Sequence, residues 1–591
     1  MPQMTHDEPL LSSPPSRQIW RQRVPFGLLM VFAAIYALAT AVSAWRTFTP
    51  VPIWDTWGAA LEFYIDVRHG VGWDAWWRQA NEHRLVLPKA LFWMEYTWFG
   101  GQQVFLIIMN YVLVGCGLAV FAAFLRARLP ALSGRSWFFG VTLLAIWLFS
   151  WVQKENLAWA NQGQFFLAQV LPLVGFYCLY RAACAPTARG WFPAACLIGV
   201  LSVGTMANGV MALPMMVLYA AVARLGRRRT LILAVLTAIC AGAYAVGYTS
   251  PSDHGGVFSK LRDRPLDMLA YTLAYLGAPF QHFVLKQQSL SWAPLSQAFG
   301  VLFVLLSLAP LPRVLRDPGA HRLDLALLTF VAYIGGLAFA TSGGRVQFGI
   351  ESALSSRYTT PTVMAWATLA ILYAPRLVAL RGAARVAMYV LLVAWLAQML
   401  IVQTRDAERK EEQHMRMTGA LALQMGVHDK RRIGMLIWND DYGAHLARGA
   451  TAVRAGIFGR PVMVEATHAV GERADALPPR CHAFVDQVET LPGEPRFVRV
   501  QGGLLPEPER KPFEAVRLVG ADGTVVGYGV PDRWRNRTPP AHAPGPFGRY
   551  LMFTAYLQVP ASGQLPPAVT LQAPGTPCSA ALVLTPPVPA S

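Results

Sequence analysis

Charged residues are scarce in this sequence. Only 14% of its 591 residues are Asp, Glu, Lys or Arg, whereas 54% are hydrophobic. A soluble domain usually contains about 25% charged residues, so the composition excludes an ordinary water-soluble enzyme. Acidic residues are especially few, because 33 Asp and Glu stand against 51 Lys and Arg and leave a net charge of +18. An excess of basic residues is typical both of proteins that bind nucleic acid and of membrane proteins. The positions of the basic residues in the sequence decide between the two.

The sequence also lacks the common catalytic and metal-binding motifs. It contains no Walker A sequence, no HExxH, no GxSxG and no GxGxxG before a strand. ATP-driven transport and the common soluble hydrolase classes are therefore without support. Its seven Cys include no CxxC or CxxH pair of the kind that binds zinc. Two of them, Cys481 and Cys578, lie in polar sequence, where an oxidising compartment would allow a disulfide and where two separate thiols fit equally well.

Long apolar runs dominate the first two thirds of the chain. About eleven of them approach the roughly 20 residues that a helix needs to cross a bilayer. They cover residues 26–45, 103–124, 136–152, 164–181, 191–206, 208–223, 229–248, 292–311, 323–340, 361–376 and 385–403. The first is too long for the apolar region of a cleaved signal and predicts a retained helix after a polar segment, 1–25. The pair between 191 and 223 requires a tight turn at 207–209.

Arginines occur in every second connection between these runs. The basic connections begin near Arg17, Arg126, Arg181, Arg224, Arg313 and Arg376. They are short and nearly free of acid, as the positive-inside rule expects of cytoplasmic connections, so topology explains the net charge without nucleic acid. The apolar segment 268–285 is predicted as an interfacial or re-entrant helix. The sequence thus predicts a polytopic α-helical membrane protein with about 11 transmembrane helices, its N-terminus inside and its C-terminus outside.

The last part of the chain, residues 404–591, differs in character from the membrane module, residues 26–403. It opens with a charged, helix-compatible stretch, QTRDAERKEEQHMRM. Alternating apolar and polar runs follow, among them RFVRVQGGLL, AVRLVG, GTVVGYGV and AVTLQA, separated by Pro and Gly. A weaker helical stretch covers residues 444–457. We therefore expect a soluble, mixed α/β and strand-rich C-terminal domain on the outer side.

The first predicted outer loop, residues 46–102, holds polar residues suited to chemistry. Asp55 follows the first span between two tryptophans, and a carboxylate at the membrane boundary can accept a proton or hold a cation. Glu82, His83 and Arg84 are adjacent, and the first two suit acid/base or metal chemistry whereas the third suits phosphate. Structural alternatives stay open: a helix N-cap for Asp55 and a salt-bridged loop anchor for the other three.

Two later outer connections add candidate binding residues. Residues 153–164 are rich in polar side chains that would be costly against lipid, so we expect them to line a water-filled cavity. The connection at 341–360 places arginines just before a span, where they suit a lipid-linked phosphate. The candidates are Lys154, Glu155, Asn156, Arg345, Arg357 and Tyr358. For the first three residues, the plainer alternative is a simple exposed loop. For the arginines, it is snorkelling of the side chain to the membrane interface.

This layout resembles the GT-C superfamily of membrane glycosyltransferases. The resemblance covers residues 20–403 and rests on Asp55, Asn81 to Arg84, Lys154 to Asn156 and Ser356 to Tyr358. It implies a sugar donor linked to polyprenyl phosphate, with Asp55 as base or metal ligand. It also implies a phosphate clamp at Arg357, together with Lys154 or Arg345. Asp55 lacks the adjacent acidic residue that several relatives have, so a divalent cation, Mg²⁺ or Mn²⁺, stays open as a cofactor.

The leading hypothesis is an inverting hexosyl- or pentosyltransferase in a bacterial inner membrane. It would move a sugar from a polyprenyl-phosphate donor to an envelope glycan, lipid or protein acceptor on the outer face. A transporter or flippase of lipid-linked sugars is the alternative from another class. A polysaccharide polymerase or ligase, which shares the donors, is the third.

Overall fold

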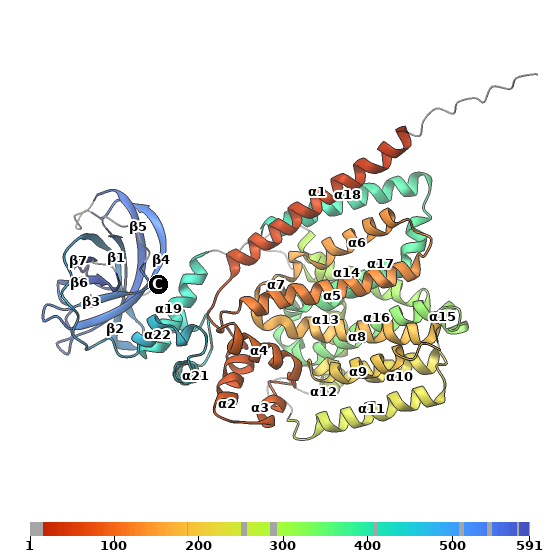
Figure 1. Cartoon of the computed structure of the whole chain (residues 1–591), viewed down its shortest axis with the longest axis horizontal. Helices are drawn as coiled ribbons and strands as arrows, with labels where there is room; N and C mark the ends of the chain where they lie inside the picture. Colours follow the sequence, from red (N-terminus) through yellow and green to blue (C-terminus); the bar gives the residue numbers. More distant parts are fainter. Residues whose placement is uncertain are drawn as a thin grey trace, which may run out of the picture.

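A bundle of long helices forms one half of the molecule, and a sheet with a few short helices forms the other (Figure 1). The computed structural model describes residues 16–185, 187–249, 257–283, 292–405, 410–506, 513–540, 546–575 and 578–589. Within these ranges, nine helices, some extended by adjoining short turns, are long and apolar enough to cross a membrane. They are built on α1 (Ser16–Thr47), α5 (Val104–Arg128), α6 (Gly134–Leu148), α8 (Gly163–Cys184), α11 (Arg227–Ala245), α14 (Ala293–Leu308), α16 (Arg322–Arg345), α17 (Thr359–Val378) and α18 (Gly382–Arg405).

The two other predicted spans are shorter helices. They are α9 (Trp191–Val203) and α10 (Ala212–Val222), and the tight turn predicted between them is a 3₁₀ segment at Ala207–Met211. The count of eleven spans therefore stays a prediction.

The apolar segment 268–285 overlaps α13 (Pro265–Gly277) and the 3₁₀ turn Ala278–Phe283, while residues 284 and 285 lie outside the described part. This 13-residue helix is too short to cross a bilayer. It packs closely on α14, because a Cβ on Gly277 would collide with the Ser296 carbonyl and one on Gly300 with the Leu273 carbonyl. Small residues allow such close approach of helices in membranes.

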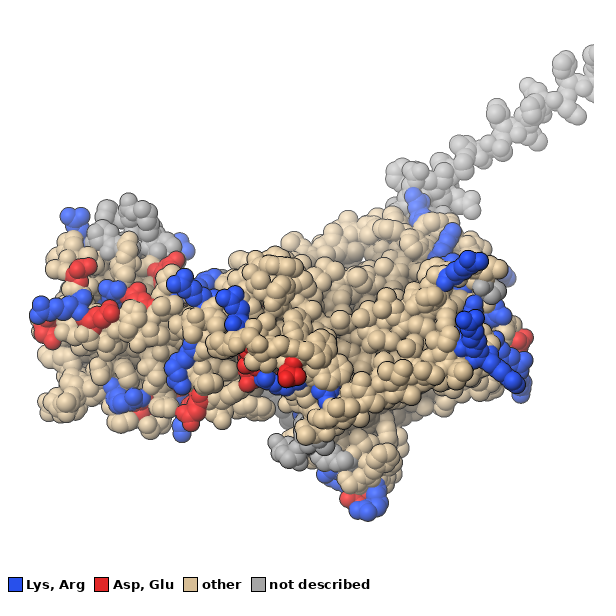
Figure 2. All heavy atoms as spheres, turned by 60° about the horizontal axis from the view of Figure 1, so that its bottom comes forward, with Lys and Arg blue, Asp and Glu red and all other residues tan. Residues whose placement is uncertain are grey.

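The predicted cytoplasmic connections lie together at one end of the bundle. Figure 2 shows Lys and Arg gathered at the end far from the sheet. Arg128 and Arg313, from two different connections, both contact the buried Asp324, with N–O distances of 2.5 and 3.1 Å. Arg322 donates to the Ala183 carbonyl of a third connection at 2.6 Å. The basic residues are therefore grouped as the positive-inside rule requires, while the side of the membrane that they face stays a prediction.

The first predicted outer loop is folded. It contains a π-helical turn (Trp57–Glu62), α2 (Phe63–Arg68), α3 (Trp73–Trp77) and α4 (Val86–Trp98). The chain after the last span forms α19 (Lys410–Met425), α20 (Lys430–Ile433), α21 (Asp440–Ala452) and α22 (Pro461–Glu465), which we call the tail helices. The loop and the tail helices bury their apolar residues in one common core.

Two polar contacts fasten the tail helices to the loop. The Tyr442 hydroxyl donates to a Glu62 carboxylate oxygen at 2.7 Å, and the backbone N–H of Trp54 donates to the Leu436 carbonyl at 2.6 Å. The tail therefore packs directly against the loop.

The strand-rich part of the tail is an eight-stranded sheet in the order β7-β6-β3-β4-β5-β2-β1-β8. The strands are β1 (Cys481–Leu491), β2 (Glu494–Pro506), β3 (Val516–Val519), β4 (Val525–Arg537), β5 (Gly548–Gln558), β6 (Ala568–Ala573), β7 (Cys578–Val583) and β8 (Val588–Pro589). All pairs are antiparallel except β1 with β8. The four runs predicted as strands are confirmed in β2, β3, β4 and β6, and α21 covers most of the predicted helical stretch at 444–457.

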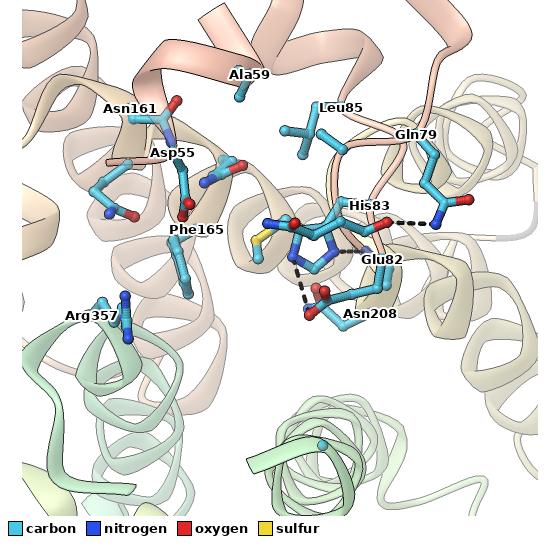
Figure 3. Close-up of a pocket in the computed structure, with 18 of the residues that line it drawn as sticks. Asp55, Ala59, Gln79, Glu82, His83, Leu85, Asn161, Phe165, Asn208 and Arg357 are labelled. Carbon is cyan, nitrogen blue, oxygen red and sulfur yellow. Dashed lines mark hydrogen bonds and ion pairs between the residues drawn. The ribbon is translucent and has the colours of Figure 1, made fainter. Parts of the chain in front are cut away.

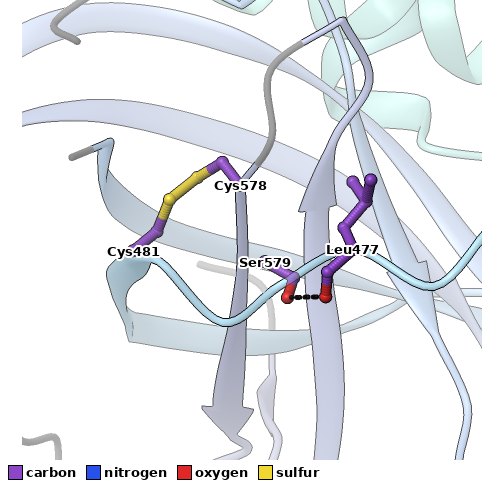
Figure 4. The surroundings of a disulfide bond; sticks show 4 residues. All are labelled: Leu477, Cys481, Cys578 and Ser579. Carbon is purple, nitrogen blue, oxygen red and sulfur yellow. Dashed lines mark hydrogen bonds between the residues drawn. A yellow bond between two sulfur atoms is a disulfide. The ribbon is translucent and has the colours of Figure 1, made fainter. Parts of the chain in front are cut away.

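A disulfide closes this sheet into a half-barrel. Cys481 at the start of β1 and Cys578 at the start of β7 are bonded, with their Cα atoms 5.6 Å apart (Figure 4). Beside them the Ser579 hydroxyl donates to the Leu477 carbonyl at 2.8 Å. Of the two possibilities that the sequence left open for these cysteines, the disulfide is the one that the structure contains.

Candidate functional site

A cavity of about 760 Å³ lies where the first outer loop, α8, α16 and the tail meet. The loop contributes residues around Asp55 and His83. The bundle contributes side chains near the N-terminal end of α8 and along the second half of α16. The tail contributes Ile437, Trp438 and Tyr442. Polar groups from three distant parts of the chain therefore face one space.

Asp55 lines this cavity with its carboxylate unengaged. The side chain is exposed, and it forms no hydrogen bond or ion pair with the residues that the structure describes. The N-cap alternative is not what the structure contains, because the cap of the π-helical turn is Thr56 and no side chain caps it. Trp54, just before, has a φ of 50°, a strained conformation for a bulky residue, of the kind that clusters at functional sites. The chain thus turns at Trp54 directly before the residue that lines the cavity.

Glu82 and His83 lie on the opposite wall (Figure 3). The backbone N–H of Ala207 donates to His83 Nδ1 at 3.1 Å, so in the neutral ring the proton is on Nε2. That Nε2 is 3.7 Å from a Glu82 carboxylate oxygen. The two neighbours therefore form an imidazole–carboxylate pair at the cavity wall, an arrangement that can relay or hold a proton.

Arg84 points away from the cavity. Its guanidinium donates to the carbonyls of Trp77, Tyr244 and Val246 at 2.8, 3.1 and 2.6 Å, and the side chain is buried. It does not line the cavity, so the substrate contact expected from the sequence has no counterpart here. The arginine instead fastens the first loop to the end of α11, which is the loop-anchor alternative without the salt bridge.

Arg345 and Arg357 bring positive charge to the cavity. Both line it, and neither forms an ion pair with a described residue. The Nε of Arg357 is buried and makes no hydrogen bond within the described part of the chain. Arg357 lies over the ring of Tyr358, with Cζ 5.3 Å from the ring centroid, and Tyr358 lines the cavity as well. At least the Nε donor of Arg357 is therefore not used by a described residue, and a guanidinium suits a phosphate.

Lys154, Glu155 and Asn156 lie beside the cavity without lining it. They form α7 (Lys154–Ala158) behind the segment that carries Arg357. The buried Asn156 amide donates to the Arg357 carbonyl at 2.7 Å and to the Thr360 hydroxyl at 2.6 Å. Asn156 therefore positions the arginine rather than facing the cavity, and the cavity contacts expected of these three residues are made by their neighbours.

Lys89, Gln169 and Asn208 also line the cavity, although their sequence context does not single them out. Only Gln169 could have been found from the sequence, because it is a polar residue inside a long apolar run and such residues often face a cavity. Lys89 is buried, and its ammonium donates to the carbonyls of Ala75, Trp76 and Arg78 at 2.8, 3.3 and 2.9 Å. This lysine ties α3 to α4 at the cavity floor.

Lys89 should make stability depend on pH. Burial, with the positive charge of Arg78 adding to it, lowers the pKa of the Lys89 ammonium to about 8 from the ordinary 10.5. Between about pH 8 and 10.5 the unfolded chain then binds more protons than the folded one, so stability from this group rises with pH through that window. We expect thermal unfolding in detergent to show a steeper rise for the wild type than for Lys89→Met.

Lys430→Met, at an exposed lysine of the tail, is the matched control for that measurement. It should keep the wild-type dependence on pH. Equal slopes for the wild type and Lys89→Met would contradict the lowered pKa.

The described residues do not offer a built cation site. Among them no group of three or more His, Cys, Asp or Glu is arranged to hold a metal ion. Asp55 stands as a single carboxylate, and the nearby Glu62 accepts the Tyr442 hydroxyl. The described residues therefore contain no ready-made cluster of such ligands for Mg²⁺ or Mn²⁺.

No protein-family model matches this chain, and a search of curated proteins finds no match. The function is therefore inferred from the cavity itself.

Proposed function

We propose that the protein is a membrane glycosyltransferase that moves a sugar from a polyprenyl-phosphate donor to an envelope glycan, lipid or protein acceptor. The observation that carries this proposal is that a carboxylate, Asp55, and two guanidinium groups, Arg345 and Arg357, line one cavity, and that none of the three forms an ion pair within the described part of the chain. A leaving phosphate needs positive charge, and an attacking hydroxyl needs a proton acceptor. Asp55 can provide the proton acceptor and the two arginines the positive charge, and all three line the same cavity.

The chemistry is a single displacement at the anomeric carbon. The acceptor oxygen bonds to this carbon while the bond from the carbon to the phosphate oxygen breaks, and the electron pair leaves with the phosphate. The proton of the acceptor hydroxyl passes to Asp55, whereas Arg345 and Arg357 stabilise the charge on the released polyprenyl phosphate. The configuration at the anomeric carbon is inverted. The Glu82–His83 pair on the opposite wall can hold the acceptor or take up the proton afterwards.

We propose a bacterial inner membrane, and two features support an orientation with the cavity and tail on its outer side. The basic connections are grouped at the far end of the bundle, and such residues favour the cytoplasmic side. The tail carries a disulfide, and disulfides persist in oxidising compartments such as the periplasm. The donor would then be reached from the outer leaflet.

The proposal is tested with a panel of radiolabelled polyprenyl-phosphate sugars and the purified full-length protein in detergent. We expect release of the sugar from at least one donor, with inversion at the anomeric carbon. Binding of donors without any release would refute the transferase. A transporter or flippase would instead move intact donor across the membrane of reconstituted liposomes, and a polymerase or ligase would require a glycan chain linked through the lipid.

Arg357→Gln should lower kcat/KM for the donor by about 10- to 100-fold. Charge-assisted hydrogen bonds to a phosphate are each worth roughly 1.5–3 kcal/mol, and a glutamine replaces one with a weak neutral contact. Arg357→Lys should recover part of the loss, because the charge remains without the planar fork. Donor kinetics measure the effect, with Arg448→Gln, an exposed position outside the cavity, as control. Equal kinetics for Arg357→Gln and the control would remove Arg357 from the phosphate site.

A further inference from the structure

Four amide side chains form a neutral polar wall in the cavity. They are Asn161, Gln162, Gln164 and Gln169, which we call the amide cluster, and all four line the cavity. They are at least 94% buried, with exposed fractions of 0, 1, 6 and 1%. They lie in an otherwise apolar candidate span, Ala160–Cys184. Buried amides at such a place are rare unless something polar binds them.

The amide cluster has hydrogen-bonding atoms without partners. Within the described part of the chain, Oδ1 and Nδ2 of Asn161 and the Oε1 atoms of Gln162, Gln164 and Gln169 are buried and make no hydrogen bond. Asn161 therefore offers a donor and an acceptor, and the three glutamines offer acceptors. A ligand that satisfies this wall must donate several hydrogen bonds and accept at least one, and the hydroxyl groups of a sugar do both.

The amide cluster carries no charge. The cationic residues at the cavity belong to other elements: Arg78 and Lys89 to the first loop, Arg345 to the end of α16, and Arg357 to the 3₁₀ turn Ser356–Tyr358 before α17. Figure 3 draws Asn161, Asp55, Phe165 and Arg357 on one side of the cavity, with Phe165 between Asp55 and Arg357 in this view. One cavity thus combines amide groups that suit hydroxyl groups, a carboxylate, and a guanidinium that suits a phosphate.

We propose that the amide cluster binds the hydroxyl groups of the donor sugar and selects an uncharged hexose or pentose over an acidic sugar. This rests on the proposed function, because it takes the sugar to be the one attached to the lipid phosphate. An acidic sugar would bring a carboxylate against acceptor oxygens with no cation in the cluster, and burying an unpaired charge is costly. The cluster therefore sets which donors are accepted, whereas Arg345 and Arg357 bind the part that all donors share.

The test uses three non-cleavable phosphonate analogues of a short polyprenyl phosphate: one carries glucose, one carries glucuronic acid and one carries no sugar. Their dissociation constants are measured with the full-length wild type, with Gln164→Leu/Gln169→Leu and with Gln297→Leu. Gln297 lies in α14 outside the cavity and is the matched control for a glutamine in a candidate span. Leucine keeps the approximate size of the side chain and suits an apolar helix.

We expect glucose to tighten wild-type binding at least about tenfold over the bare lipid, and glucuronic acid to give no such gain. The double variant should lose the gain from glucose while binding the bare lipid as the wild type does, which also shows that it is folded. Gln297→Leu should keep the gain. If the double variant does not fold, the single variants Gln164→Leu and Gln169→Leu replace it, each with a partial loss.

Three results would overturn the amide proposal. Glucose that adds nothing would mean that the cluster holds only water, and glucuronic acid that binds as well as glucose would remove the selectivity. A gain from glucose that persists in the variants would place the sugar elsewhere. In each case sugar release by the wild type, measured in parallel, shows whether the transferase itself stands. A wild type that binds none of the analogues and releases no sugar would overturn both proposals.

Discussion

Asp55→Asn should lower the rate of sugar transfer by about 10²–10⁴-fold while leaving donor binding within a few-fold of the wild type. A positioned general base typically contributes this much to a reaction rate. Asparagine keeps the shape of the side chain but cannot take the proton of the acceptor hydroxyl. The carboxylate forms no ion pair or hydrogen bond with described residues, so its replacement leaves no other group unpaired, and the fold should be unaffected.

The measurement compares steady-state transfer and donor affinity for the wild type, Asp55→Asn and Asp74→Asn. Asp74 is exposed in the same loop and does not line the cavity, which makes it the matched control. Transfer should also continue in EDTA, because the described residues offer no built cation site. If Asp55→Asn transfers sugar as fast as Asp74→Asn, another group is the base, and the Glu82–His83 pair becomes the next candidate. Loss of wild-type transfer in EDTA would require a cation that Asp55 helps to hold.

The membrane helices and several cavity residues could be predicted because their signals are local. Apolar runs of about 20 residues are readable one by one, and arginines at their ends mark one side of the membrane. Asp55 and Arg357 are polar residues close to the ends of such runs, where polar groups are costly unless they serve a purpose, and His83 belongs to a polar Glu-His-Arg sequence within the loop 46–102. All three line the cavity.

The direction of each side chain could not be predicted in the same way. His83 and Arg84 are neighbours, yet His83 faces the cavity whereas Arg84 binds three backbone carbonyls on the other side. Which way a loop residue points depends on the turn that carries it, and here Asn81 has a φ of 50°. The same holds for Asn156, which supports Arg357 from behind.

The contribution of the tail to the cavity depends on contacts between distant residues. Tyr442 meets Glu62 across a sequence separation of 380 residues, and nothing in either local sequence indicates the other. The burial of residues in the sheet also depends on contacts between distant parts of the chain. Alternation in RFVRVQ predicts one apolar face and one solvated face, but Val498 and Val500 pack in the sheet's own core whereas Phe497 and Arg499 face the tail helices. The polar residue on the second face is therefore buried.

Arg499→Met should destabilise the sheet and its junction with the tail helices by about 3–5 kcal/mol. Arg499 is 1% exposed and makes ion pairs with both Asp429 and Glu489. Its Nε donates to Glu489 at 2.7 Å, and the Tyr556 hydroxyl donates to Asp429 at 2.9 Å. Removing this cation leaves two buried carboxylates without the guanidinium that forms their ion pairs, which is the costly case among buried ion pairs. Hydrogen exchange of the β2 amides in the full-length protein measures the loss.

Two further variants show whether the cost arises from unpaired charge. Arg537→Met removes a more exposed ion pair on the same sheet, with Asp486 at 2.5 Å, and should cost no more than about 1 kcal/mol. Arg499→Met combined with Asp429→Asn and Glu489→Gln removes all three charges and should recover much of the lost protection. Equal losses in Arg499→Met and Arg537→Met would contradict a special role for this cluster.

The position of Arg499 also links the stability of the sheet to the cavity. Asp429 caps α20 through the backbone N–H of Arg432 at 3.2 Å, and the chain from α20 leads within a few residues to Leu436, which binds Trp54 next to Asp55. Weakening the Arg499 cluster should therefore loosen the cavity wall made by Ile437 and Trp438. We expect Arg499→Met to raise KM for the acceptor more than for the donor, because Arg345, Arg357 and the amide cluster belong to the helical bundle and not to the tail.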